Sequence, residues 1–380
     1  IFDVCKGVIM VNPSNRVKSI ELSQIRKMFE VTNENAINLG IGEPDFDVPE
    51  NVKIAIKQAV DDGETHYTSN KGDIELREAI VDKFDKDNNI KTVADNVIVT
   101  AGASEALYAC AQALFDKGDN ILIPNPGFLS YVACVNLSEA NPIEVPAKME
   151  NGFKLKVEDV QNLIDNNTKA LILNSPSNPT GAVMDKEDIK GIADLATDHD
   201  FMIISDEIYE KIIYDKKHYS PAEYSDNVIT INGFSKTYAM TGLRIAYMAG
   251  NEAITEELLK IHQYCIACAS SISQKAAYAA LTGPQNAVND MVNEFARRRD
   301  LIVSSLNDMG YECTDCDGAF YAFPKVERPQ EFVQKAAEAG VISVPGSAFG
   351  SLGEEHVRMS YANSYENIEK AMDILRDLEY

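Results

Sequence analysis

Short apolar runs alternate with amphipathic segments along most of the chain. From about residue 95, five runs rich in Val, Ile and Leu occur in the strings NVIVT, DNILIP, TKALILN, FMIIS and NVITIN. Each run is bounded by turn residues, and amphipathic helical patterns occur between them. Near-continuous apolar strands separated by helices are typical of a mostly parallel sheet that is covered on both faces. The pattern therefore predicts an α/β fold.

The segment 186–197 carries the clearest helical pattern. Its predicted apolar face is made of Ile189, Ile192, Ala193 and Ala196. Asp185 precedes the segment and is a candidate N-cap. We therefore predict a helix here with one face on the sheet.

A second region begins near residue 290. A long charged helix around EFARRRDLIVSSLNDMG leads to the strand-like GAFYAFP, the helix EFVQKAAEAG, and the strands VISVP and HVRMSYA. This order predicts a smaller α+β domain. We expect an N-terminal arm that forms part of the small domain over residues 1–45, a large domain over 46–288 and the small domain over 289–380.

Composition narrows the class of protein. The chain has 380 residues, 45% hydrophobic and 25% charged, with a formal net charge of -24. The length corresponds to about two domains, and the negative charge disfavours binding to nucleic acid. No apolar run approaches the roughly 20 residues that cross a bilayer, and the first residues show no signal-peptide pattern.

The seven cysteines predict reduced thiols in a cytoplasmic protein. Cys265 and Cys268, with Cys313 and Cys316, have the outline of a zinc site. However, the segment KIHQYCIACASSISQ is read as helix, and the two pairs lie much further apart than the roughly 15–20 residues of a compact zinc ribbon. We therefore predict structural thiols and no metal.

Candidate chemistry lies where the predicted strands end, because ligands of such sheets bind beyond the carboxyl ends of the strands. The residues at these ends are Gly102, Ala103, Ser104, Phe128, Asn178, Asp206, Tyr209, Ser235 and Lys236, with Arg244 following. The last three ends are spaced by about 30 residues, the size of one strand–helix repeat. These side chains can therefore meet in one crevice.

Part of this set is suited to an anion. Gly102, Ala103 and Ser104 open a predicted helix, whose N–H groups and dipole favour negative charge. Arg244 adds a group that can bind a phosphate through two hydrogen bonds. Taken singly, Gly-Ala-Ser is also a common turn, so the anion site depends on the rest of the set.

The other residues are suited to an aromatic ring that carries a carbonyl. Phe128 offers a flat face, and Asp206 follows an apolar strand and requires a cationic or proton-donating partner if it is buried. Asn178 and Tyr209 can bind an oxygen, and Lys236 can form a Schiff base with a carbonyl. Pyridoxal phosphate requires all of these groups together.

Two nucleotide-binding alternatives fail. FMIISDE is similar to the acidic strand of P-loop NTPases, but the chain contains no GxxxxGK[S/T] motif. LGIGEPDF begins like a dinucleotide loop, yet Asp45 replaces the third glycine and no strand–helix unit surrounds it. The anion site is therefore not predicted to bind a nucleotide.

The ordered motifs resemble those of class I pyridoxal-phosphate-dependent aminotransferases of fold type I. The likeness runs from INLGIGEPDF through HYTSNKGDIELREAI, AGASEAL, PNPGFLSY, NSPSNPTG, SDEIY and GFSKTYAMTGLRIAY to GAFYAFP, VPGSAFG and VRMSYA. Within the class, the chain is most similar to archaeal and bacterial aspartate aminotransferases. The resemblance implies a mostly parallel seven-stranded sheet with helices on both faces and a smaller α+β domain.

The resemblance also implies a role for each candidate. Lys236 corresponds to the Schiff-base lysine, and Asp206 to the partner of the pyridinium nitrogen. Asn178 and Tyr209 correspond to the ligands of the phenolic oxygen, and Phe128 to the aromatic residue that stacks on the ring. The phosphate site corresponds to Ala103, Ser104 and Arg244, and Gly102 and Ser235 are also expected to contact the cofactor.

Three residues enter only through the resemblance. Tyr67 corresponds to a tyrosine that reaches the phosphate of the neighbouring subunit, which implies a homodimer. Arg358 corresponds to the arginine that binds the substrate α-carboxylate, and Gly42 lies where the backbone approaches the same group; Phe128 and Asn178 are also expected beside the substrate.

One departure is Gly233, where many relatives carry Ser. Either one phosphate contact is missing, or Ser235 replaces it.

The implied reaction is ping-pong transamination, with Lys236 as the general base. The expected donor is aspartate and the expected acceptor is 2-oxoglutarate. A distal carboxylate needs a further cation, for which Arg16, Lys18 and Arg26 are candidates. Alanine or aromatic donors, and a pyridoxal-phosphate C–S or β-lyase on the same fold, stay open. A DNA-binding regulator is disfavoured, because no basic helix-turn-helix segment precedes residue 40.

Overall fold

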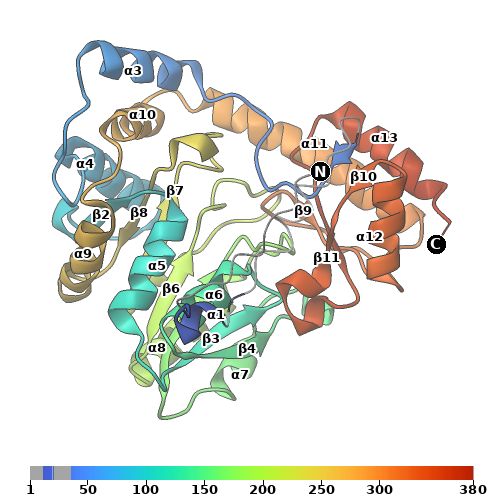
Figure 1. Cartoon of the computed structure of the whole chain (residues 1–380), viewed down its shortest axis with the longest axis horizontal. Coiled ribbons are helices and arrows are strands. Elements are labelled where there is room, and N and C mark those ends of the chain that lie inside the picture. The colour runs from blue at the N-terminus through green and yellow to red at the C-terminus, as the bar shows by residue number, and fades with distance from the viewer. Residues whose placement is uncertain (1–11, 19, 21–35, 380) are drawn as a thin grey trace.

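The computed structural model describes residues 12–18, 20 and 36–379. Seven strands form its main sheet (Figure 1). In spatial order they are β2 (Val97–Thr100), β8 (Ala246–Ala249), β7 (Val228–Gly233), β6 (Met202–Asp206), β5 (Thr168–Asn174), β3 (Asn120–Asn125) and β4 (Asn141–Pro146). Neighbours are parallel except where β8 pairs with β2 and β7. The predicted mostly parallel seven-stranded sheet is confirmed.

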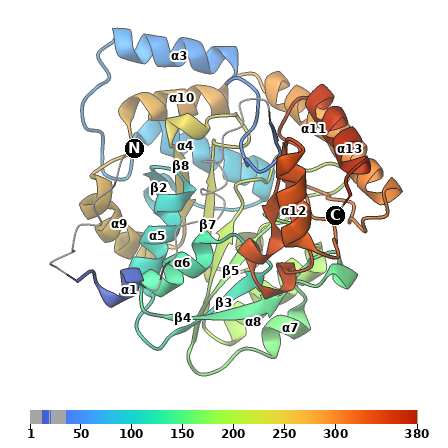
Figure 2. The ribbon, with the colours of Figure 1, turned by 45° about the vertical axis from the view of Figure 1, so that its right-hand side comes forward.

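Helices cover both faces of this sheet (Figure 2). They are α3 (Glu50–Asp61), α4 (Ile74–Lys83), α5 (Ala103–Leu114), α6 (Ser130–Leu137), α7 (Val157–Gln161), α8 (Lys186–Asp198), α9 (Glu252–Ile266) and α10 (Ser271–Thr282). Side chains alternate along each strand, so Ile121 and Ile123 of β3 join the core under α5, α6 and α9, whereas Leu122 joins the core under α7 and α8. Among the described residues, no helix is long and apolar enough to span a membrane.

Helix α8 confirms the predicted segment and corrects its cap. Its predicted apolar face is buried, as expected. Asp185 occupies the N-cap position, but its side chain makes no capping hydrogen bond. Instead, its carboxylate pairs with Lys154 at 2.9 Å. The competing cation therefore removes the side chain from the helix end.

The sequence predicts one continuous helix through Cys265 and Cys268, and this prediction is wrong. Helix α9 ends at Ile266, and Ala267 has φ +65°. Asn70 donates a hydrogen bond to the Ala267 carbonyl at 2.7 Å, and a new N-cap, Ser270, begins α10. The break therefore coincides with one long-range hydrogen bond, from Asn70, and with one local cap, at Ser270. Free thiols are found at Cys110, Cys134, Cys265, Cys268, Cys313 and Cys316.

The C-terminal region contains three helices and short strands (Figure 1). They are α11 (Asn286–Asp308), β9 (Tyr321–Ala322), α12 (Pro329–Glu338), β10 (Val341–Ile342), β11 (Val344–Pro345), β12 (Val357–Ser360) and α13 (Tyr365–Arg376). The N-terminal strand β1 (Ile37–Asn38) pairs in parallel with β10. This pairing agrees with an N-terminal contribution to the small domain, whereas the division at residues 45 and 288 stays a prediction.

Candidate active site

A cavity of about 290 Å³ opens at the carboxyl ends of the central strands. Its size is close to the lower end of the roughly 300–1,000 Å³ range of small-molecule sites. The predicted residues that line it are Gly42, Ala103, Ser104, Phe128, Asn178, Asp206, Tyr209, Ser235, Lys236, Arg244 and Arg358. Two predicted residues do not line it: Gly102 is the N-cap of α5, and Tyr67 has an 88% exposed side chain outside the cavity. The strand ends therefore converge as predicted.

The start of α5 and Arg244 form one end of the cavity. Gly102 has φ +85°, and a Cβ atom at this position would lie 2.3 Å from Nη2 of Arg244. The guanidinium group therefore occupies the space that a side chain at position 102 would fill. Arg244 is exposed, has φ +49°, and donates from Nη1 to the Thr241 carbonyl at 3.1 Å. A cation beside a helix N-terminus is an arrangement suited to a phosphate.

Asp206 is the acid of the cavity. It is the last residue of β6 and is 4% exposed. Its Oδ2 accepts a hydrogen bond from Tyr131 at 2.8 Å, and its Oδ1 accepts one from the Ile208 amide at 3.3 Å. Burial raises the pKa of Asp206 to about 6, although both hydrogen bonds oppose the shift. A buried carboxylate of this kind favours a cationic or protonated partner.

Lys236 is the nucleophile and base candidate of the cavity. Its Nζ donates a hydrogen bond to the Gly42 carbonyl at 2.5 Å. Burial lowers the pKa of Lys236 to about 8; Glu43 opposes this shift, and Arg244 and Arg358 add to it. The amine therefore loses its proton at a lower pH than an ordinary lysine does, and this property suits a nucleophile or general base.

Arg358 forms the opposite end of the cavity and is 2% exposed. It donates from Nη1 to Oδ1 of Asn178 at 3.0 Å and from Nη2 to the Gly40 carbonyl at 2.6 Å. Its Cζ lies 4.7 Å and 4.9 Å from the ring centroids of Tyr321 and Phe349. Its buried Nε has no hydrogen-bond partner among the described residues. A buried guanidinium group with an unsatisfied donor is suited to a carboxylate.

Sequence reasoning missed four polar residues of the cavity wall, which are Tyr131, Asn174, Thr241 and Tyr321. Asn174 is the last residue of β5 and donates to the main-chain carbonyl of Asp206 at 2.9 Å, so the strand-end rule would have found it. Tyr131 follows Phe128 by three residues, and the rings of these two residues meet edge to face. Tyr321 has no comparable local signal; its hydroxyl lies 2.8 Å from that of Tyr209 because distant segments meet here.

The departure at Gly233 has a packing reason. A Cβ atom at this position would lie 2.6 Å from Cβ of Ala246 on the paired strand β8 and 3.2 Å from Cδ1 of Ile208. A serine therefore does not fit between these strands as they are placed. Ser235 is 7% exposed and lines the cavity.

The proposed cations for a distal carboxylate do not reach the cavity where they are described. Arg16 and Lys18 lie on the exposed helix α1 (Asn15–Lys18) and are not among the lining residues. Arg26 lies outside the described residues. The cations of the described cavity lining are Lys236, Arg244 and Arg358.

Residues 34–375 match the model of the family described as aminotransferase class I and II. This chain belongs to that family. It is 48% identical over 374 residues to the "Probable aspartate aminotransferase" of Methanocaldococcus jannaschii, over 96% of this chain and 99% of that protein. It is 42% identical over 374 residues to the "Aromatic-amino-acid aminotransferase 2" of Thermococcus litoralis, over 95% of this chain and 96% of that protein.

The solved structure of aspartate aminotransferase from Thermus thermophilus with maleate superimposes with a TM-score of 0.92. The two sequences are 36% identical, and the match covers 96% of this chain and 99% of that chain. The fold of this aminotransferase is therefore fold type I.

The cofactor of this aminotransferase is pyridoxal 5′-phosphate. The cavity residues fit this group. Its phosphate matches the cradle that a Cβ atom on Gly102 would fill, and its ring nitrogen matches the buried carboxylate of Asp206. The aldehyde matches the amine of Lys236, whose pKa is lowered.

Proposed function

We propose that this aminotransferase moves the amino group of L-aspartate to a 2-oxo acid, with 2-oxoglutarate as the main acceptor, in two half-reactions. The observation that supports the proposal best is the position of the Lys236 amine in one cavity with two arginines, Arg244 and Arg358. The name of the Methanocaldococcus jannaschii relative supports aspartate, and the dicarboxylate maleate in the Thermus thermophilus structure agrees with it.

Each residue of the cofactor half has a separate task in this proposal. Arg244 and the N-terminus of α5 hold the phosphate, together with the hydroxyl groups of Ser104 and Ser235. Asp206 keeps a proton on the ring nitrogen, because a buried carboxylate is stabilised by a positive neighbour. Asn178 and Tyr209 bind the ring oxygen, and Phe128 covers a ring face. When bound, pyridoxal phosphate supplies an aromatic ring that accepts electrons from the substrate Cα.

The substrate half is built around Arg358. Its guanidinium group binds the α-carboxylate, with Asn178 and the backbone at Gly42 beside it. This contact fixes the direction of the bond between Cα and hydrogen. Lys236 then removes the proton from Cα as a neutral amine, which its lowered pKa favours.

The replacement Lys236→Ala tests the central assignment. We expect loss of the half-reaction with L-aspartate in a single-turnover measurement, because no other amine lines the described cavity. The matched control is Lys190→Ala, which removes an exposed lysine paired with Asp194 on α8. If Lys236→Ala turns over at the rate of this control, the proposal is wrong.

Aromatic amino acids are a second candidate class of donor. The described lining offers no cation beyond the three already assigned, while Leu107, Phe128, Tyr131 and Ile208 add apolar surface. The Thermococcus litoralis relative also carries the name of an aromatic-amino-acid aminotransferase.

A panel of L-aspartate, L-tyrosine, L-phenylalanine and L-alanine with 2-oxoglutarate separates these classes. We expect the highest kcat/KM for aspartate. A higher value for tyrosine or phenylalanine would replace aspartate as the donor. Release of ammonia and pyruvate without a 2-oxo acid would instead indicate a β-lyase.

We also propose a cytoplasmic homodimer in which Tyr67 completes the phosphate site of the neighbouring subunit. Tyr67 is 88% exposed and lies outside the cavity of its own chain, so its side chain is available to contact a second subunit. Exposed Ile54, Val60 and Ile74 lie on nearby parts of the same chain. Sedimentation of the native enzyme is expected to give twice the monomer mass. A monomer with full activity would contradict it.

A further inference from the structure

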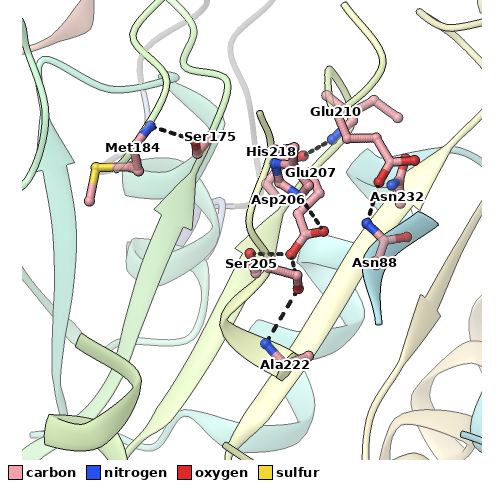
Figure 3. A network of polar contacts seen from close by, with 12 residues as sticks. Asn88, Ser175, Met184, Ser205, Asp206, Glu207, Glu210, His218, Ala222 and Asn232 are labelled. Atoms are coloured by element: carbon pink, nitrogen blue, oxygen red, sulfur yellow. Dashed lines mark hydrogen bonds and ion pairs between the residues drawn. The ribbon is translucent and has the colours of Figure 1, made fainter. Parts of the chain in front are cut away.

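Residues 206–210, at the end of β6 and just after it, place some side chains in the cavity and bury others behind it. Asp206 and Tyr209 line the cavity, whereas Glu207 and Glu210 are buried behind it, at 0% and 7% exposure. Figure 3 shows the two glutamates with their polar neighbours. Strand β6 ends at Asp206 and residues 208–210 form a turn, so Asp206 and Tyr209 face the cavity while the residue after each, Glu207 or Glu210, is buried.

Glu207 holds this segment to the loop that follows it. Its Oε1 accepts hydrogen bonds from Ser205 at 2.8 Å and Ser220 at 2.6 Å. Its Oε2 is 2.9 Å from Nε2 of His218, and its amide donates to the Ile231 carbonyl of β7 at 2.8 Å. The carboxylate therefore ties the end of β6 to the 218–220 loop, and the backbone amide of Glu207 ties the same point to β7.

Glu210 holds the other end of the segment to α4. It forms an ion pair with Lys83, and its Oε2 accepts a hydrogen bond from Asn88 at 2.7 Å. Burial alone would raise the pKa of Glu210, but the charge of Lys83, with His218 and Asn88, lowers it to about 2. The carboxylate is therefore charged and fully bonded near neutral pH.

These contacts do not indicate a metal site. Ligand atoms of Glu207, Glu210 and His218 lie within 4.8 Å of one another. However, the ammonium group of Lys83 already neutralises Glu210 from inside the cluster. The cluster therefore has its own cation.

We propose that Glu207 and Glu210 are positioning residues, which fix the turn 206–210 from behind so that Asp206 and Tyr209 meet the cofactor ring at the correct distance. Buried ionic groups seldom add stability over apolar ones, so stability alone does not account for two of them here. Errors of about 1 Å in a site can cost roughly 100-fold in rate. The inference rests on the proposed function of Asp206 and Tyr209.

The test uses Glu207→Gln and Ser220→Ala in the holoenzyme. Ser220→Ala is the variant that changes no charge: it removes the hydrogen bond to Glu207, together with the one that the Ser220 hydroxyl accepts from the Ala222 amide. The main readout is the pH midpoint at which the absorbance of the bound cofactor changes, since contacts at the ring nitrogen and ring oxygen set this midpoint. A second readout is kcat against KM for the amino donor.

We expect both variants to move the midpoint, Glu207→Gln by about half a pH unit or more, and to lower kcat more than they change KM. The matched control is Asp188→Asn, which breaks the ion pair between Asp188 of α8 and Lys156 at the start of α7. This control is expected to lower the melting temperature and leave the midpoint unchanged.

Midpoints equal to wild type in both variants, with only a lower melting temperature, would overturn the inference. If Glu207→Gln does not fold, the midpoint of Ser220→Ala alone decides whether the inference stands. Failure of the proposed function has a different signature, because wild-type enzyme would then show no transfer from any donor in the panel.

Discussion

The two arginines of the cavity, Arg244 and Arg358, differ in their burial and in the contacts that hold their guanidinium groups. Arg358 is 2% exposed and is fixed by two hydrogen bonds and two aromatic rings. Arg244 is exposed, and its guanidinium group has one hydrogen bond, to the carbonyl of Thr241 three residues earlier. The Arg358 end of the cavity, proposed to bind the carboxylate, is therefore preorganised within one chain, whereas the Arg244 end, proposed to bind the phosphate, is open.

We infer from this difference that Arg358 selects the substrate and that Arg244 helps to retain the cofactor. A fixed guanidinium group loses little entropy when it binds a carboxylate, so it can favour one geometry of the substrate. The open end combines the N-terminus of α5 with the exposed charge of Arg244, which suits a phosphate that stays bound through many turnovers. Replacements at each arginine should therefore change different measured quantities.

The largest effect is expected for Arg358→Gln. Removal of a buried, hydrogen-bonded charge costs about 2–5 kcal/mol, so kcat/KM for the amino donor should fall on the order of 10³-fold. Steady-state kinetics measure this fall, and equilibrium dialysis should show unchanged affinity for pyridoxal phosphate. Arg358→Lys keeps the positive charge and is the matched control. We expect it to recover little of the lost kcat/KM, because lysine cannot bind a carboxylate bidentately. Equal losses of cofactor and substrate affinity would contradict the comparison.

A smaller effect is expected for Arg244→Gln, and on cofactor affinity. One lost charge-assisted hydrogen bond costs about 1.5–3 kcal/mol, so the dissociation constant of pyridoxal phosphate should rise about 10- to 100-fold. Equilibrium dialysis measures the rise. At saturating cofactor, KM for the donor should stay near wild type. A raised KM with unchanged cofactor binding would place Arg244 on the substrate side instead.

Tyr321→Phe should have a modest effect at the boundary between the two ends. The variant keeps the ring that lies 4.7 Å from Arg358 but removes the hydroxyl that lies 2.8 Å from that of Tyr209. One neutral hydrogen bond contributes about 0.5–1.5 kcal/mol, so kcat should fall about 2- to 10-fold. KM for the donor should change little, because the ring remains. Tyr321→Leu removes both features and should also raise KM, and equal KM values for the two variants would contradict the role of the ring.

Whether the sequence could predict a feature depends on how far apart in the chain its contacting residues lie. Strand ends such as Asp206 and Lys236 were predictable, because apolar runs mark the strands and parallel strands share one edge. The helix over α8 was predictable from its apolar face. These features depend on neighbours in sequence or on a rule of sheet topology.

Contacts between distant segments were not predictable. Asp185 lost its capping role to Lys154, and the helix at Cys265 broke because Asn70 binds a carbonyl there. Tyr321 reaches Tyr209 from the C-terminal region. Each depends on the packing of regions that are far apart in the chain, and hydrophobic periodicity carries no information about it.

The smallest expected effect is a shift in the pKa of the Lys236 amine when either arginine is replaced. Acylating reagents react with the neutral amine, so labelling of apoenzyme followed by mass spectrometry should rise as the pH passes the lowered pKa of Lys236, about 8. Each arginine disfavours the ammonium form, and Arg244 contributes more than Arg358. Arg244→Gln should therefore raise the midpoint by a larger fraction of a unit than Arg358→Gln. Glu43→Gln removes a negative neighbour and should shift it the other way, and a wild-type midpoint near the ordinary value of 10.5 would contradict the burial of this amine.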